Sequence, residues 1–219
     1  MTSTFSPLRR LLLAAVPALA LGLGACADKD APRYKLSAGE RAWAEAFQQG
    51  HIWTFRNTTT GYERRYRVKE VKDKMESNVT KSLSITSYQQ VVKVKVIRED
   101  STSFRATGTA DDVNMRGYQL LLALEAQSSQ DPARLLINWT TGFSVPVGEL
   151  EQGATAPLLP SFTAANGITY QNVVQLQYTY PTGPFYGPAP AWILRRLYYT
   201  KADGIIQFEE TGGHVWARQ

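Results

Sequence analysis

Residues 90–98 read Gln-Val-Val-Lys-Val-Lys-Val-Ile-Arg, so valines alternate with lysines along the middle of the segment. Successive side chains leave a β-strand on opposite faces, whereas a helix repeats its faces every 3.6 residues. A period of two therefore predicts a half-buried strand. Residues 62–69, Tyr-Glu-Arg-Arg-Tyr-Arg-Val-Lys, show the same alternation and predict a second strand.

Turn signals separate more runs of this kind up to the end of the chain. Asn166-Gly167 and Asp203-Gly204 are strong hairpin signals, because both central residues of a type I′ turn need a positive φ. The predicted strands cover residues 51–57, 62–72, 82–87, 90–98, 103–109, 113–126, 134–140, 143–147, 168–180, 192–200, 204–210 and 214–218. So many strands must curl or split into two layers to protect their apolar faces. The sequence predicts an all-β, mainly antiparallel fold: a curved sheet closing towards a barrel, or a two-layer sandwich.

One short N-terminal helix is expected before the strands. Ser37 and Glu40 have the spacing of a capping box, in which each side chain bonds the backbone of the other residue. Trp43 and Phe47 then recur at helical spacing, and Gly50 stands where a helix would end. The helix is predicted to lay its two aromatic rings on the sheet.

The first 26 residues have the layout of a secretory signal. Arg9 and Arg10 precede an apolar run over residues 11–23, and small residues follow it. The run is shorter than the roughly 20 apolar residues that a helix needs to cross a bilayer. Residues 1–25 are therefore predicted to be a cleaved signal peptide.

Leu23-Gly24-Ala25-Cys26 resembles the lipobox of bacterial lipoproteins, which signal peptidase II cleaves before the cysteine. The resemblance implies that Cys26, the one cysteine of the chain, carries a diacylglycerol and further acylation such as palmitate. Several acyl chains hold a protein firmly to a bilayer, since each buried methylene contributes about 0.8 kcal/mol. Residues 26–36 would be a flexible tether, and Ala27 after the cysteine resembles the signal for the outer membrane, facing the periplasm or the cell surface.

The last third of the chain resembles uncharacterised β-rich lipoproteins of the bacterial envelope, at the level of strand and hairpin pattern. The segments that carry this resemblance are residues 167–173, 197–201, 204–208 and 213–216. The resemblance implies a β fold in the cell envelope and carries no activity with it.

The size of the chain favours a single domain, and its charge does not favour nucleic-acid binding. Removal of residues 1–25 would leave 194 of the 219 residues, which fits a single β-rich domain over residues 37–219. Residues 148–160 and 181–190 would be its long loops. The formal net charge of +5 would fall to +3 because Arg9 and Arg10 leave with the signal. No dense basic block exists in the sequence, so nucleic acid is not expected as a partner.

No catalytic, metal or cofactor motif is recognisable in the sequence. His51 and His214 are the two histidines, too few for a histidine-rich metal site, and both are expected at strand ends. Ser144 lies in a sequence that starts like a nucleophile elbow, but Pro146 replaces the required glycine. The adjacent acids Asp111 and Asp112, like Glu99 and Asp100 before them, are assigned to turns. No cofactor is predicted, and the chain is not expected to be an enzyme.

A Pro-stiffened aromatic loop is the candidate binding site. Residues 178–188 are rich in tyrosine and proline, and Trp192 follows them. Exposed rings on a restrained loop could stack on sugars or apolar ligands, which makes Tyr180, Phe185, Tyr186 and Trp192 the candidate binding residues. The same rings could instead cap the open end of the β domain.

Three functions are compatible with the sequence. The leading hypothesis is a lipid-anchored envelope protein whose β domain is a non-catalytic binding or structural module, with an envelope protein or a hydrophobic or glycan ligand as partner. The first alternative is a lipocalin-like carrier of a lipid or hydrophobic molecule. Its cavity would be lined by Leu120, Leu122, Leu124, Val174, Leu176 and Tyr178. The second alternative is a cell-wall or glycan hydrolase with two acids facing each other across a cleft.

Overall fold

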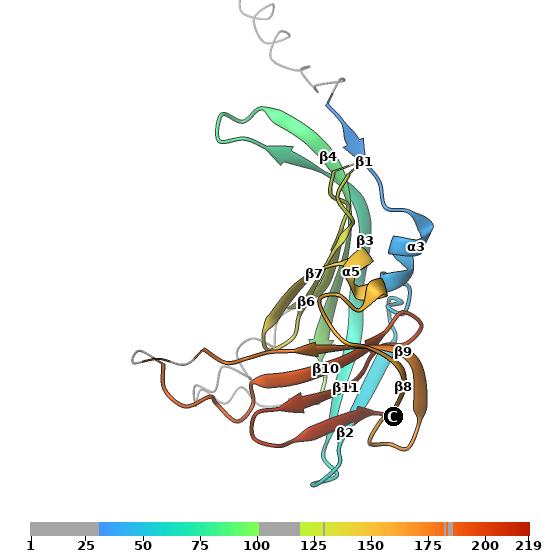
Figure 1. Cartoon of the computed structure of the whole chain (residues 1–219), viewed down its shortest axis with the longest axis vertical. Coiled ribbons are helices and arrows are strands. Elements are labelled where there is room, and N and C mark those ends of the chain that lie inside the picture. The colour runs from blue at the N-terminus through green and yellow to red at the C-terminus, as the bar shows by residue number, and fades with distance from the viewer. Residues whose placement is uncertain (1–30, 101–118, 129, 182, 184–185) are drawn as a thin grey trace, which may run out of the picture. The chain divides into compact units, whose positions relative to one another are not determined.

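The computed structural model describes residues 31–100, 119–128, 130–181, 183 and 186–219 (Figure 1). Contacts divide the described chain into a small unit, residues 31–32 and 77–88, and a larger unit, residues 33–76 and 89–219. Cys26, Phe185 and the predicted strand 103–109 lie outside the described residues. No helix within the described ranges has the length and apolar character needed to cross a membrane.

The fold is mainly antiparallel β, as predicted, and its strands form one curled sheet rather than two stacked layers. The strands are β1 (Arg33–Tyr34), β2 (Ile52–Asn57), β3 (Glu63–Val79), β4 (Ile85–Arg98), β5 (Gln119–Glu125), β6 (Arg134–Asn138), β7 (Gly142–Pro146), β8 (Leu158–Thr163), β9 (Thr169–Gln177), β10 (Leu194–Thr200), β11 (Gly204–Glu210) and β12 (Val215–Arg218). Their order is β7-β6-β5-β4-β3-β2-β12-β11-β10-β9-β8, with β1 paired to β4 beside this path.

This order consists of two meanders that meet at β2 and β12. From β2 the chain adds one neighbour after another as far as β7, and from β8 it does the same as far as β12. The antiparallel pairing of Phe55 with Arg218 and of Asn57 with Trp216 then joins the two meanders. Strands β7 and β8 stand at the two ends of the path, and helix α5 (Val147–Gln152) connects them in the chain.

Several predicted boundaries were wrong in the middle of the chain. Predicted strands 82–87 and 90–98 are one strand, β4, and β3 continues to Val79. The predicted loop 148–160 contains most of α5 and the start of β8. Helix α5 was missed because it is short. It begins directly after Pro146 and ends at Gly153, which has a φ of 68°.

The predicted N-terminal helix is confirmed as α3 (Ala38–Arg41), which continues into the 3₁₀ turn η1 (Ala42–Ala44) and ends before Phe47 and Gly50, earlier than predicted. Its capping box is complete. The Glu40 amide donates to Ser37 Oγ at 3.2 Å, and the Ser37 amide donates to Glu40 Oε2 at 2.8 Å. Glu40 Oε1 also accepts from the amide of Ala133 at 3.0 Å, so the same carboxylate ties the helix to the start of β6.

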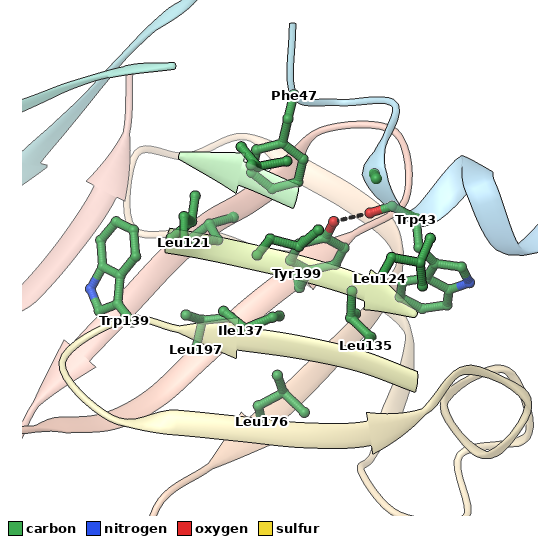
Figure 2. Packing of buried hydrophobic residues seen from close by; sticks show 14 of the residues in the cluster. Trp43, Phe47, Leu121, Leu124, Leu135, Ile137, Trp139, Leu176, Leu197 and Tyr199 are labelled. Carbon is green, nitrogen blue, oxygen red and sulfur yellow. Dashed lines mark hydrogen bonds between the residues drawn. The ribbon is translucent and has the colours of Figure 1, made fainter. Parts of the chain in front are cut away.

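The core of the larger unit lies between the two halves of the curled sheet. Figure 1 shows β10 and β11 running across the direction of β6 and β7. Figure 2 shows Leu124, Leu135 and Ile137 on one side of the core, facing Leu197 and Tyr199. Trp43 and Phe47 of the N-terminal segment cover one end of this core and stack on Tyr199, with ring centroids 5.8 and 6.2 Å away. The aromatic pair of the predicted helix therefore packs on the sheet as expected.

Candidate binding groove

Strand β9 reverses its faces at Asn172. Tyr170 and Val173 belong to one hydrophobic cluster although residues three apart in a regular strand face opposite sides. The facing strand β8 shows the same change, because Leu159 and Phe162 join that cluster. Asn172 has a φ of 52°, the left-handed conformation that asparagine tolerates better than most residues. One unusual backbone residue thus turns the first half of β9 over.

The reversal leaves part of β9 without a strand partner. The ladder between β9 and β10 ends at the pair Val174–Tyr199, whereas β8 stays paired with β9 down to Thr169. The Ile168 carbonyl accepts from the Ala164 amide, so in this half the even-numbered residues bond towards β8. The N–H and C=O groups of Thr169 and Gln171 consequently point to the other side, where the described part of β10 has already turned away.

A groove of about 740 Å³ opens at this divergence. One wall is the first half of β9, and the other is the turn between β10 and β11. The lining residues are Trp43, Glu151, Leu158, Ile168, Thr169, Tyr170, Gln171, Asn172, Thr200, Lys201, Ala202 and Asp203. Ile168 is 49% exposed, so the groove offers apolar surface to solvent beside the unpaired backbone groups.

An ion pair marks one end of the groove. Lys201 Nζ donates to Glu151 Oε1 and lies 5.1 Å from the centre of the Trp43 ring, and the indole N–H of Trp43 donates to the same carboxylate oxygen at 3.3 Å. The hydrogen bond from Lys201 is the main reason that the pKa of Glu151 is lowered, with the indole N–H adding to it. Glu151 is therefore held as an anion at neutral pH.

The β9 wall is fastened to the rest of the sheet. The amide of Ala165, in the β8–β9 turn, donates to Gln207 Oε1 at 2.8 Å, and Asn166 Nδ2 donates to the Arg218 carbonyl at 2.5 Å. Phe162 stacks on Tyr198 with centroids 4.2 Å apart. This hairpin lies over β11 and β12, so the groove wall is held in place from its far end.

The predicted aromatic site does not coincide with this groove. Tyr180 and Trp192 are half-buried, Tyr186 is 55% exposed, and Phe185 lies outside the described residues. None of the three described rings lines the groove. Whether they bind a ligand stays a prediction.

The residues considered for chemistry are not brought together. His51 precedes β2 and His214 precedes β12, while the Ser144 hydroxyl accepts from Arg134 on the neighbouring strand at 2.9 Å. In the portion of the chain that is described, no group of three or more His, Cys, Asp or Glu side chains could hold a metal ion. Glu99 is paired with Arg67, which lowers the pKa of its carboxyl, and Asp111 and Asp112 lie outside the described residues.

The residues expected to line a carrier cavity are mostly core residues. Leu122, Leu124, Val174 and Leu176 are at most 3% exposed and belong to the main hydrophobic cluster. The groove is lined by a different set of side chains. Sequence analysis missed it because the unpaired edge depends on the backbone of Asn172.

No protein-family model matches this sequence, and no curated protein and no solved structure shows significant similarity to it.

Proposed function

We propose that the chain is a lipid-anchored bacterial envelope protein whose β domain is a non-catalytic binding module. We further propose that the groove receives an extended segment of another envelope protein, which pairs with the first half of β9. The observation that carries this proposal is the stretch of β9 that keeps β8 but loses β10, next to a groove of about 740 Å³.

Backbone geometry favours a peptide as the ligand. An added strand bonds to alternate residues of a free edge, and side-chain pockets beside the edge supply specificity. Thr169 and Gln171 are two residues apart, which is the repeat that an antiparallel partner strand needs. Ile168 and Tyr170 border the same edge and would contact the side chains of the added strand.

The groove's charges support binding rather than acid–base chemistry. Of its two acids, Glu151 is neutralised by Lys201, and Asp203 Oδ2 accepts from the Thr200 hydroxyl at 2.9 Å. A general acid needs a carboxyl group that holds its proton near neutral pH, and the lowered pKa of Glu151 is a shift in the opposite direction.

The anchor is tested in a bacterial host by exchanging Cys26→Ser. We expect the mass of the N-terminal peptide of the wild-type chain to show a diacylated or triacylated cysteine, and the protein to fractionate with membranes. The Cys26→Ser chain should remain unprocessed and lose the acyl mass. An unmodified thiol in the wild-type chain would overturn this part of the proposal.

The groove is tested with a randomised peptide library displayed on phage and selected on the intact mature protein. Gln171→Pro removes the groove-facing N–H without touching the ladder to β8, while Gln171→Ala keeps that N–H. Selected peptides should bind Gln171→Ala within about twofold of the wild type and Gln171→Pro at least tenfold more weakly. A tenfold loss of affinity corresponds to the loss of one or two hydrogen bonds. Hydrogen exchange of β8 checks that both variants stay folded.

Two results would contradict the peptide proposal. Selected peptides that bind both variants equally would show that the β9 edge is not used. Failure to select any peptide, together with saturable binding of a fluorescent fatty-acid probe, would replace the proposal by the hydrophobic carrier.

A further inference from the structure

The turn between β3 and β4 presents apolar side chains to solvent. Leu83 is 83% exposed, more than any other large hydrophobic residue in the described chain, and Val79 is 50% exposed. Lys81, between them, is exposed as well. This turn belongs to the small unit formed by residues 31–32 and 77–88.

The turn is closed by two hydrogen bonds, and its geometry does not require a leucine at position 83. The Thr80 amide donates to the Ser84 carbonyl at 2.9 Å and the Leu83 amide to the Thr80 carbonyl at 2.9 Å, which closes a three-residue hairpin loop. The last residue of such a loop adopts the left-handed conformation and is ordinarily glycine. Leu83 occupies it with a φ of 63°, although leucine is disfavoured there. Leu83 therefore presents its apolar side chain to solvent although the backbone conformation is unfavourable for leucine.

The same unit contains the point where the chain enters the fold. The Tyr88 amide donates to the Pro32 carbonyl at 2.8 Å. Pro32 is the sixth residue after Cys26, which is about 20 Å of chain even when fully extended. Tyr88 is likewise the sixth residue after Ser82 at the tip, which is again about 20 Å of extended chain. A bilayer that holds a lipid on Cys26 would therefore lie within about 20 Å of this hydrogen bond. The tip can extend over the same distance.

We infer that the β3–β4 tip, with Val79, Lys81 and Leu83, is a second membrane contact that inserts its aliphatic side chains into the lipid surface beside the acylated Cys26. This inference rests on the proposed lipid attachment. The chemistry fits an interface, because leucine and valine enter the acyl boundary while a lysine beside them meets anionic headgroups. Two aliphatic side chains alone would bind a bilayer weakly, and the tether raises their effective concentration at its surface.

The test uses the chain from Cys26 to Gln219, coupled through its one thiol to a maleimide phospholipid in vesicles of phosphatidylethanolamine and phosphatidylglycerol. An environment-sensitive fluorescent amino acid replaces Ser82 at the tip. In a matched control it replaces Thr59, an exposed residue in the turn at the other end of β3. Because the coupling is chemical, the result does not depend on whether cells acylate Cys26.

We expect the probe at position 82 to shift to the blue on coupling and to be quenched by lipids brominated in their acyl chains, and the probe at 59 to do neither. Leu83→Asn keeps a residue that tolerates the left-handed conformation and should abolish the shift at 82 while the hairpin remains folded. Equal emission and equal iodide quenching at positions 82 and 59 would overturn the inference. A blue shift that survives Leu83→Asn would overturn the role of that side chain.

Discussion

The phenol of Tyr199 donates a hydrogen bond to the backbone carbonyl of Trp43, 156 residues away in the sequence (Figure 2). Tyr199 is also the last residue of β10 that pairs with β9, and Trp43 lines the groove. The contact therefore ties Trp43, which lines the groove, to the position on β10 at which β9 and β10 separate. Complete burial raises the pKa of Tyr199, so the phenol keeps the proton that it donates.

Replacement of Tyr199 by Phe should destabilise the protein by about 1–3 kcal/mol, because it leaves the buried Trp43 carbonyl without this donor. The stacking of the two rings can persist in the variant, since the benzene ring of residue 199 is retained. Urea unfolding measures the loss as a lower midpoint. Tyr178→Phe, at a half-buried tyrosine outside the main cluster, is the control and should change stability by less than about 0.5 kcal/mol. Equal effects of the two changes would argue against the importance of the Trp43 contact.

A buried ion pair joins β3 to β11. Arg64 Nη1 donates to Glu210 Oε1 at 2.6 Å, the indole N–H of Trp216 donates to Oε2 at 3.0 Å, and the guanidinium lies 3.8 Å from the centre of the Trp216 ring. Arg64→Met leaves the carboxylate of Glu210 buried without its cation and should cost about 3–5 kcal/mol. Adding Glu210→Gln removes that charge and keeps an acceptor for Trp216, so the double variant should recover much of the loss. A double-mutant cycle by urea unfolding measures this coupling, and strictly additive losses would contradict it.

Glu40 should make stability depend on acid pH. Burial opposes ionisation of Glu40, but hydrogen bonds from the backbone of Ser37 and Ala133 and from the Ser37 hydroxyl outweigh it and lower the pKa. A lowered folded-state pKa stabilises the fold above the ordinary carboxyl pKa of about 4.3, and this contribution disappears as the pH falls through the folded-state value. Glu40→Gln should cost about 1 kcal/mol at pH 7 and progressively less towards pH 3. Urea midpoints measured across this range would contradict the assignment if the gap between the two proteins stayed constant.

Alternation of polar and apolar residues predicted β2 and the first half of β3 well, because one face of each is buried. The Asp203-Gly204 turn signal placed the start of β11 correctly, and the spacing of Ser37 and Glu40 predicted the capping box, since both signals depend on neighbouring residues. No such pattern marks β8, Leu-Leu-Pro-Ser-Phe-Thr, where Pro160 lies within the strand, or α5, whose two buried residues Val147 and Leu150 are too few to define a period. The groove was not predictable from the sequence. Neither Asn172 on β9 nor Lys201 after β10 carries a local signal that these two strands separate.

The reversal of β9 depends on the backbone of Asn172, and substitutions there should separate conformation from side-chain chemistry. Asn172→Gly keeps the left-handed conformation at little cost, so its stability should lie within about 0.5 kcal/mol of the wild type. Asn172→Val forces a β-branched side chain into that conformation and should cost about 1–2 kcal/mol. Hydrogen exchange provides the second measurement. The amides of Thr169 and Gln171 should exchange quickly in the wild type and in Asn172→Gly, because no strand of the described chain protects them, while those of Val174 and Leu176 should exchange slowly. Slow exchange at Thr169 and Gln171 in the free protein would contradict the open edge and, with it, the proposed site for an added strand.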